Sequence, residues 1–188
     1  MKPFILLVED DPQQAESIKR AIERHFPQYT VVVVDTEYAF RTRVDELARA
    51  ASIPRMVVCE VMLPWEYPNP TTPDVPPEVR EGTFRKAGTR CWKYFRQKTE
   101  FQRVPWIYFT VLDDVTIEFV QHSDLLTSYV QKSGSILPFL KDMGDILLFS
   151  GLWNQTEQGI PDQPGASPEM MRILREGELE RIRPTNIP

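Results

Sequence analysis

Five short runs of apolar residues, spaced along most of the chain, are its strongest structural signal. They occupy residues 4–8, 30–34, 56–61, 106–111 and 128–131. The first four runs are continuous rather than alternating, which is typical of parallel strands that are buried on both faces of a sheet. The pattern therefore predicts five short strands.

Helical patterns separate these runs. The first helix is expected to begin at Asp11 and Pro12, because a capping carboxylate followed by proline favours the first turn of a helix. Apolar residues near helical spacing predict four further helices, around residues 40–51, 92–98, 115–126 and 136–147. Strand and helix thus alternate five times, which indicates a parallel sheet with helices on both faces. In such folds the ligand site lies at the carboxyl ends of the strands.

Two segments depart from this alternation. Residues 64–83 contain six prolines, and this density predicts neither a helix nor a central strand there. The C-terminal region, residues 151–188, begins with a stretch rich in Gly, Pro, Gln and Asn that is expected to be a linker, and a short charged helix is expected over 168–183. We therefore expect one domain over residues 1–150, with an insert at about 65–84.

The composition restricts the class of function. The chain has 188 residues, a formal net charge of −5 and a pI of about 5.2, so it lacks the basic surface that nucleic-acid binding requires. No apolar run approaches the roughly 20 residues of a membrane span, and the N-terminal run is too short for a signal peptide. Cys59 and Cys91 alone suggest no disulfide framework. We expect a cytoplasmic protein that binds neither nucleic acid nor membrane.

Side chains that could bind a ligand or take part in a reaction lie at the predicted carboxyl ends of the strands. Glu9 and Asp10 follow the first strand, Glu60 lies at the end of the third, and Thr110 and Lys132 lie at the ends of the fourth and fifth. Clustered carboxylates are oxygen ligands for a hard cation such as Mg²⁺. A lysine and a hydroxyl are suited to hold a phosphoryl oxygen.

The residues around these positions resemble the receiver domain of two-component response regulators. The resemblance covers about residues 3–148 apart from the insert, and no single motif in it is decisive. It rests on an ordered set, each member at its own strand end: Val8-Glu9-Asp10-Asp11-Pro12, Cys59-Glu60-Val61-Met62-Leu63-Pro64, Thr110 and Lys132. It implies a flavodoxin-like (βα)5 three-layer sandwich with a parallel sheet in the order 2-1-3-4-5.

The resemblance also implies roles for individual residues. Glu9 and Asp10 match the acidic pair that binds Mg²⁺, and the backbone carbonyl of Met62 matches the third protein ligand. Thr110 matches the hydroxyl that contacts the phosphoryl group, and Lys132 matches the lysine that pairs with it. Mg²⁺ is the one cofactor that the resemblance implies.

Other positions match the family or depart from it. Tyr129 matches the aromatic residue that changes orientation on activation, and Gly88 resembles the glycine that opens the third helix. The position of the phosphate-accepting aspartate, however, is Glu60, and Ser133 stands where the family usually has a proline. The insert of about 20 residues, beside the predicted site, is a further departure.

Glu60 determines the functional hypothesis. A glutamate is one methylene longer than aspartate, and phosphoryl transfer depends mainly on positioning, so we expect a poor acceptor or none. Glu60 either imitates the phosphorylated state through a pair with Lys132, or marks a decayed site; the residues leave both readings open. In either case the chain is expected to act as a pseudo-receiver in bacterial signal transduction, without enzymatic activity. Its partner would be a sensor kinase or a downstream effector, and a homodimer is compatible with this.

Two alternatives compete with this hypothesis. In one, the chain is a phosphorylatable, Mg²⁺-dependent response regulator that receives phosphate from a histidine kinase. In the other it is an unrelated flavodoxin-like enzyme, which the absence of a Gly-rich loop after the first strand disfavours. The insert is expected to be a partner-binding arm, a lid or a loop without a role. Basic residues near the third helix are expected to form a solvated face or to dock an acidic partner: Arg85, Lys86, Arg90, Lys93, Arg96 and Lys98.

Overall fold

The computed structural model describes residues 2–66, 75–112 and 126–156, with side chains through residue 150. The chain divides into two compact units, Met1–Gly151 and Leu152–Pro188, and the fold described below is that of the first unit.

Five parallel strands form one sheet in the order β2-β1-β3-β4-β5. The strands are β1 (Phe4–Val8), β2 (Thr30–Val34), β3 (Met56–Cys59), β4 (Trp106–Thr110) and β5 (Thr127–Gln131). The predicted flavodoxin-like order is therefore confirmed. Because every pair is parallel, the carboxyl ends of all five strands meet at one edge of the sheet.

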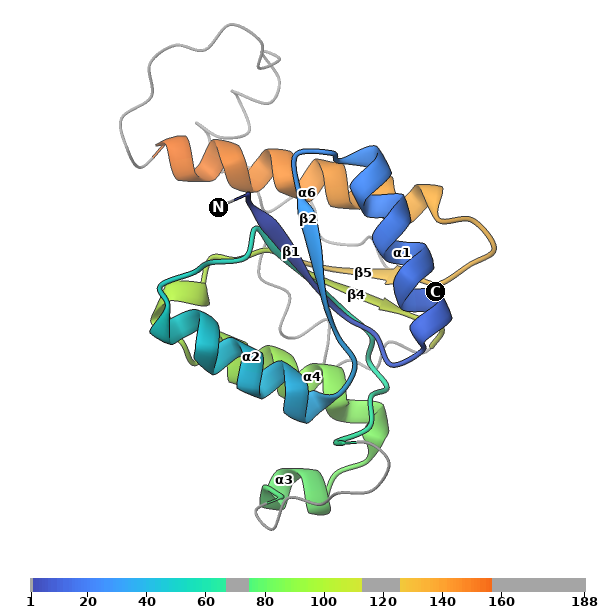
Figure 1. Ribbon diagram of the computed structural model, residues 1–188, viewed down its shortest axis with the longest axis vertical. Helices are drawn as coiled ribbons and strands as arrows, with labels where there is room; N and C mark the ends of the chain where they lie inside the picture. The colour runs from blue at the N-terminus through green and yellow to red at the C-terminus, as the bar shows by residue number, and fades with distance from the viewer. Residues whose placement is uncertain (1, 67–74, 113–125, 157–188) are drawn as a thin grey trace, which may run out of the picture. The chain divides into compact units, whose positions relative to one another are not determined.

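Helices cover both faces of this sheet (Figure 1). The long helices are α1 (Pro12–His25), α2 (Glu37–Arg49), α4 (Ala87–Arg96) and α6 (Leu137–Thr156). Shorter turns are α3 (Pro77–Arg80), η1 (Phe84–Lys86) and η2 (Thr99–Phe101). Helices α1 and α6 lie on one face, whereas α2 and α4 lie side by side on the other, which gives the predicted three layers.

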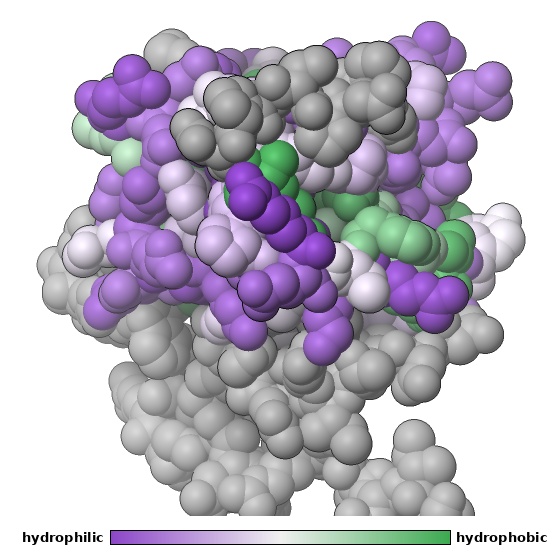
Figure 2. All heavy atoms as spheres, turned by 90° about the horizontal axis from the view of Figure 1, so that it is seen from below, coloured by the Kyte–Doolittle hydropathy of each residue, from purple (hydrophilic) through white to green (hydrophobic). Residues whose placement is uncertain are grey.

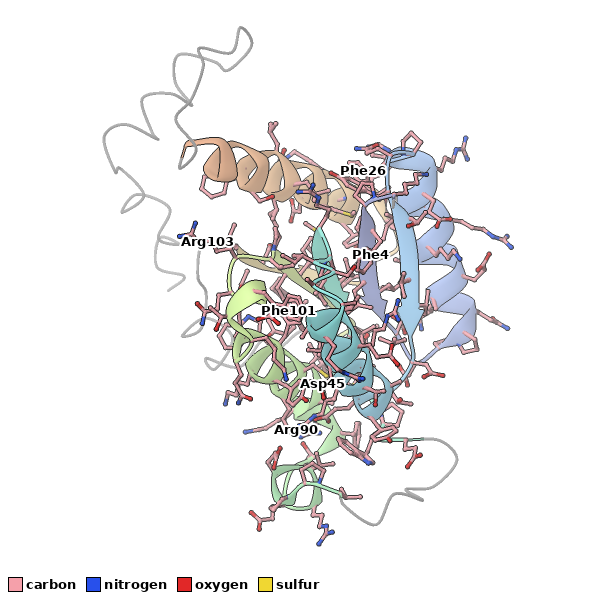
Figure 3. All side chains as sticks on the ribbon, turned by 60° about the vertical axis from the view of Figure 1, so that its left-hand side comes forward. Phe4, Phe26, Asp45, Arg90, Phe101 and Arg103 are labelled. Atoms are coloured by element: carbon pink, nitrogen blue, oxygen red, sulfur yellow. The ribbon has the colours of Figure 1, made fainter. Side chains whose placement is uncertain are left out.

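Each face of the sheet has its own core, which explains why β1, β3 and β4 are continuously apolar and buried on both faces. The same prediction is wrong for β2, which lies at the edge of the sheet with only Val31 buried. Successive side chains of a strand point to opposite faces. In β1, Leu6 packs into the core under α2 and α4, and Leu7 packs into the core under α1 and α6. Aromatic rings fill both layers: Phe95 and Phe101, the latter labelled in Figure 3, stack at 4.7 Å in the first core.

Figure 2 shows one face of the molecule by the hydropathy of its residues. The part of the face in Figure 2 that carries colour is mostly hydrophilic, and its hydrophobic side chains form small, separate patches. Among the described residues, no helix combines the length and the hydropathy needed to cross a bilayer.

Three element boundaries differ from the predictions. β3 ends at Cys59 instead of Val61: Glu60 N still donates to Val8 O, but the N–H groups of Val61 and Met62 donate to the side chain of Glu60 rather than to a neighbouring strand. α4 begins at Ala87, before the first of the apolar residues that predicted it. α6 continues to Thr156, into the predicted linker, since each of its two glycines, Gly144 and Gly151, costs only about 1 kcal/mol inside a helix.

The proline-rich segment also differs from its prediction, which excluded any helix there. The structure has a one-turn helix, α3, that begins at Pro77. Proline is compatible with the first position of a helix, where its missing N–H has no intrahelical partner to lose. The helices predicted over 115–126 and 168–183 lie outside the described residues.

Gly88 allows α4 to approach the loop after β3. Its N–H donates to the carbonyl of Val61 at 2.9 Å. A Cβ at position 88 would lie 2.7 Å from the carbonyl oxygen of Glu60 and 2.8 Å from the Cα of Val61. Both neighbours are backbone atoms, so neither can rotate away. The match of Gly88 to the family's glycine thus has a steric reason, and it concerns the loop that carries Glu60.

Gly88→Ala is expected to lower the free energy of unfolding by about 1–3 kcal/mol, since the added methyl group forces the α4 backbone away from this loop. Urea denaturation measures the effect. Gly134→Ala is the matched control, because no atom lies within 4 Å of a Cβ built there. Equal stability of the two variants would contradict this account of Gly88.

Candidate functional site

The sheet topology brings together side chains that are far apart in the sequence. Backbone hydrogen bonds continue past the strand ends: Glu60 N donates to Val8 O at 2.9 Å, and Lys132 N donates to Thr110 O at 2.6 Å. Glu9, Glu60 and Thr110 are consequently buried, with exposed fractions of 2%, 5% and 0%. Two carboxylates thus lie in an interior where charged groups require compensation.

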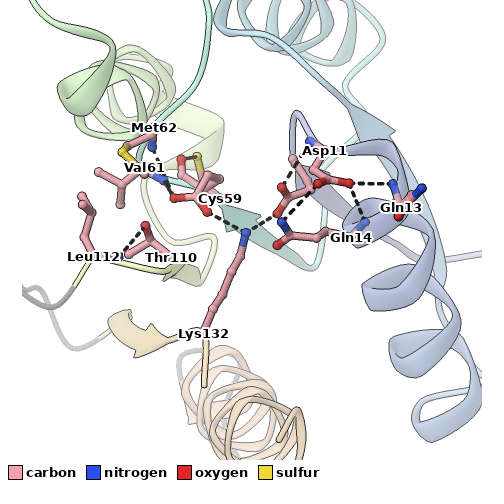
Figure 4. A network of polar contacts seen from close by, with 11 residues as sticks. Asp11, Gln13, Gln14, Cys59, Val61, Met62, Thr110, Leu112 and Lys132 are labelled. Atoms are coloured by element: carbon pink, nitrogen blue, oxygen red, sulfur yellow. Dashed lines mark hydrogen bonds and ion pairs between the residues drawn. The ribbon is translucent and has the colours of Figure 1, made fainter. Parts of the chain in front are cut away.

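Lys132 supplies that compensation. Its Nζ lies 2.6 Å from Glu9 Oε2 and 2.6 Å from Glu60 Oε2, and its side chain is 10% exposed. Figure 4 shows the Lys132 side chain reaching between the loop after β3 and the start of α1. The expected pairing of Glu60 with Lys132 is present, and the same ammonium also binds Glu9.

The second oxygen of each carboxylate binds backbone N–H groups. Glu60 Oε1 accepts from Val61 N at 2.7 Å and from Met62 N at 3.3 Å. Glu9 Oε1 accepts from Asp11 N at 3.3 Å. Both oxygens of Glu60 are therefore engaged, one by an ammonium and one by the turn that follows β3.

The charges of this cluster are strongly coupled. Burial raises the pKa of Glu9, and the attraction of Lys132 offsets only part of that rise. For Lys132 burial acts to lower the pKa, but Glu60 and Glu9 together outweigh it and raise the pKa. Lys132 therefore stays protonated throughout the neutral range and holds the two carboxylates together.

Thr110 and Tyr129 meet at the loop after β4. Thr110 Oγ1 accepts from Leu112 N at 3.4 Å, and the hydroxyl of Tyr129 donates to the carbonyl of Leu112. Tyr129 is half-buried and packs against the core beneath α2 and α4. The backbone of Leu112 thus connects the predicted phosphate-contacting hydroxyl to the predicted switch residue.

The predicted Mg²⁺ ligands border the same pocket. Glu9, Asp10 and Met62 line it together with Glu60 and Lys132. Among the described residues, however, no three His, Cys, Asp or Glu side chains are grouped closely enough to hold one ion. Lys132 already binds one oxygen of Glu9, so a divalent cation at that carboxylate would compete with the ammonium.

A third buried carboxylate, Glu37, was missed by sequence reasoning. It is 0% exposed. Arg90 Nη2 lies 2.6 Å from Glu37 Oε2, and Arg41 Nη2 lies 2.8 Å from Glu37 Oε1. Only the Glu37–Arg41 pair, four residues apart on one helix, is visible in the sequence. Arg90 comes from α4, and Figure 3 places it beside α2.

This cluster attaches both ends of the proline-rich insert to the domain. The carbonyl of Pro64 accepts from Glu37 N at 3.0 Å, at the start of α2. On the other side, Arg41 binds Glu78 at 3.2 Å and Arg90 donates to the carbonyl of Thr83 at 3.0 Å. The described flanks of the insert are therefore part of the folded domain.

The basic residues near α4 form the predicted solvated face only in part: Arg85, Lys86 and Lys93 are exposed, whereas the other three are half-buried. Arg90 belongs to the Glu37 cluster. Arg96 Nη1 donates to three backbone carbonyls between residues 101 and 104, and Lys98 lies 2.7 Å from Asp45. Three of the six basic residues thus hold the domain together, which weakens the case for an acidic partner at this face.

Lys132→Met is expected to lower the free energy of unfolding by about 3–5 kcal/mol at pH 7, because it leaves two buried carboxylates without a counter-charge. Without the ammonium, the pKa of Glu9 rises further above its ordinary value of 4.5. A carboxyl group whose pKa is higher in the folded protein than in the unfolded chain stabilises the fold while it is protonated. This stabilisation is present below pH 4.5 and is lost as the pH rises through the pKa of the folded state. The deficit should therefore be smaller at pH 4 than at pH 7, as measured by urea denaturation.

Lys141→Met is the matched control for this prediction. Lys141 pairs with Asp145 at 3.0 Å, but both side chains are exposed, so the expected change is within about 0.5 kcal/mol. A Lys132→Met variant that loses the same stability at both pH values would contradict the buried-charge account.

Glu37→Gln is expected to lower the free energy of unfolding by about 3 kcal/mol. This is the lower end of the range for removing one partner of a buried ion pair, because glutamine keeps some of the hydrogen bonds. Trypsin should also cut the insert flank near Arg80 and Arg85 faster. Glu46→Gln, in the exposed pair with Arg43, should change neither stability nor cleavage. Unchanged cleavage in Glu37→Gln would show that this cluster does not hold the insert.

Comparisons with known proteins identify the fold. No family model and no curated protein matches the chain. Solved structures do: a non-phosphorylated HemR receiver domain from Leptospira biflexa has a TM-score of 0.53 at 20% identity, covering 88% of this chain and 100% of that one. A signal receiver domain from Clostridium thermocellum has a TM-score of 0.58 at 13% identity, covering 78% and 98%.

A third match is the receiver domain of the sensor histidine kinase PA1611 from Pseudomonas aeruginosa, described with a magnesium ion in its active-site cleft. Its TM-score is 0.52 at 17% identity, and it covers 80% of this chain and 99% of that one. At these identities the similarity concerns the fold. The described domain therefore has the flavodoxin-like fold of response regulator receiver domains, with a proline-rich insert after β3.

Proposed function

We propose that this chain is a pseudo-receiver, which acts in signal transduction by binding a protein partner and accepts no phosphoryl group at Glu60. The observation that carries the proposal is the contact of Lys132 with Glu60 and Glu9, at 2.6 Å each. In the family that the sequence resembles, the lysine pairs with the phosphoryl group. Here a carboxylate of the chain itself takes that place.

The geometry of Glu60 disfavours phosphoryl transfer. Its Oε2 binds Lys132, and its Oε1 binds two backbone N–H groups. An attacking oxygen would first have to leave one of these partners. A misplacement of about 1 Å at the reacting atoms can already cost roughly 100-fold in rate. The longer glutamate side chain therefore favours a permanent ion pair over an acceptor.

This ion pair supports partial imitation of a phosphorylated site. A glutamate carries one negative charge, against about −1.5 to −2 for a phosphoryl group. The attraction for Lys132 is correspondingly weaker, but it is permanent. Thr110 and Tyr129 both bind the backbone of Leu112, so the loop after β4 and strand β5 are coupled beside the pair. We propose that a sensor kinase or downstream effector reads this single state.

The alternative is a phosphorylatable response regulator that needs Mg²⁺ and a histidine kinase. One observation favours it: Glu9, Asp10 and Met62 line the same pocket as Glu60 and Lys132, as the family's chemistry requires. In this reading Glu9, Asp10 and the carbonyl of Met62 would hold Mg²⁺, which would supply charge neutralisation beside Glu60.

Intact-mass spectrometry after incubation with acetyl phosphate and Mg²⁺ distinguishes the two. The unmodified protein is expected to gain no phosphoryl mass, whereas Glu60→Asp, with its shorter side chain, is expected to gain one. Glu60→Gln is the control, since it offers no carboxylate at this position. A phosphoryl group on the unmodified protein that is absent from Glu60→Gln would overturn the proposal and favour the alternative.

A further inference from the structure

The pocket above Glu60 is lined by two unlike sets of residues. Its volume is about 570 Å³. The polar set, called the polar side below, is Glu9, Asp10, Asp11, Gln14, Glu60 and Lys132. The apolar set, called the apolar side below, is Met62, Leu63, Pro64, Phe84 and Val111. The apolar side comes largely from the two ends of the proline-rich insert.

Two apolar residues of this wall are open to solvent. Phe84 is 60% exposed and Val111 is 50% exposed, although both lie beside a buried charge cluster. Burying such side chains is favourable by about 25 cal/mol for each Å² removed from water. An exposed aromatic side chain at the edge of a pocket is therefore a suitable anchor for a binding partner.

The backbone at Phe84 is held in place before any partner binds. The carbonyl of Phe84 accepts from Leu63 N at 3.3 Å, so the two ends of the insert meet there. The preceding carbonyl, of Thr83, accepts from Arg90, which Glu37 holds from α2. A contact residue on a fixed backbone loses little conformational entropy on binding.

The charge of the pocket selects the sign of the ligand. Four carboxylates line it, from Glu9, Asp10, Asp11 and Glu60, against the single ammonium of Lys132, which leaves a formal charge of −3. The net charge of the whole chain, −5, has the same sign. An anionic ligand would therefore be repelled, and a cationic one would be attracted and steered.

Simple ligands satisfy only one side of this pocket. A metal ion would meet the carboxylates but leave Phe84 and Val111 exposed. An apolar ligand would cover these two residues but take water from the carboxylates without replacing its hydrogen bonds. A ligand that carries an apolar group beside a cationic one satisfies both sides.

We propose that this pocket docks a protein segment in which an arginine or lysine stands next to an aliphatic or aromatic residue. The inference rests on the proposed function, since it names the chemistry of the partner that a pseudo-receiver would bind. The basic side chain faces Asp10 and its neighbouring carboxylates, and the apolar side chain packs on Phe84 and Val111. Arginine suits the polar side best, because its guanidinium can bind a carboxylate through two hydrogen bonds.

An array of ten-residue synthetic peptides, probed with the labelled full chain, tests this proposal. It contains three sets matched in length and apolar content: basic, acidic and uncharged. Binding is expected in the basic set. Phe84→Ser and Asp10→Asn should each weaken it by about tenfold or more, the effect of losing one anchor in an interface.

Ile53→Ser is the matched control. Ile53 is 51% exposed, and it precedes β3, so it lies toward the opposite edge of the sheet from the pocket. This variant should bind the basic peptides as the unmodified protein does. Circular dichroism verifies that all three variants are folded.

Three results would overturn the inference: no binding in any set, equal binding in all sets, or binding to the basic set that Phe84→Ser leaves intact. None of them bears on whether Glu60 accepts a phosphoryl group. Conversely, phosphorylation of Glu60 would overturn the proposed function whatever the peptides do, so the two failures are distinguishable.

Discussion

The ammonium of Lys132, 2.6 Å from both Glu9 and Glu60, is the contact on which this site depends. Two nearly buried carboxylates would repel each other, and burial alone would drive protons onto them. One cation between them makes both charges tolerable, and it joins the ends of β1, β3 and β5. The same contact occupies one oxygen of Glu60, and the backbone N–H groups of Val61 and Met62 occupy the other, so in the proposed function one arrangement both stabilises the site and disfavours phosphoryl transfer.

A buried charge that binds two groups of opposite charge occurs twice in the described domain. Glu37 is buried between Arg41 and Arg90, much as Lys132 is placed between two carboxylates. The first cluster determines the charge state of the pocket, and the second holds the insert that supplies its apolar wall. Neither cluster needs to add much net stability, since buried ion pairs often only compensate the cost of desolvation. Their effect is to specify one arrangement, because breaking either pair leaves an isolated buried charge.

Similarity to solved receiver domains and the chemistry of this chain answer different questions. The matched structures are 20% identical or less and establish the arrangement of strands and helices. Function depends on particular side chains placed on that arrangement. Here Glu9, Asp10, Thr110 and Lys132 stand at the expected strand ends, while Glu60 is one methylene longer than aspartate and already bound to Lys132. The proposed recognition of a partner, in place of phosphoryl transfer, rests on that difference.

The sequence by itself determined the architecture and the members of the site. Continuous apolar runs specify strands buried on both faces, and residues at the ends of parallel strands must meet at one edge, so Glu9, Glu60, Thr110 and Lys132 could be grouped in advance. Only the tertiary structure decided that Lys132 bridges two carboxylates, that Arg90 reaches Glu37, and that Phe84 borders the pocket. The ion pairs among these contacts join residues 53 to 123 positions apart, and their geometry follows from how the layers pack, which local sequence patterns do not encode.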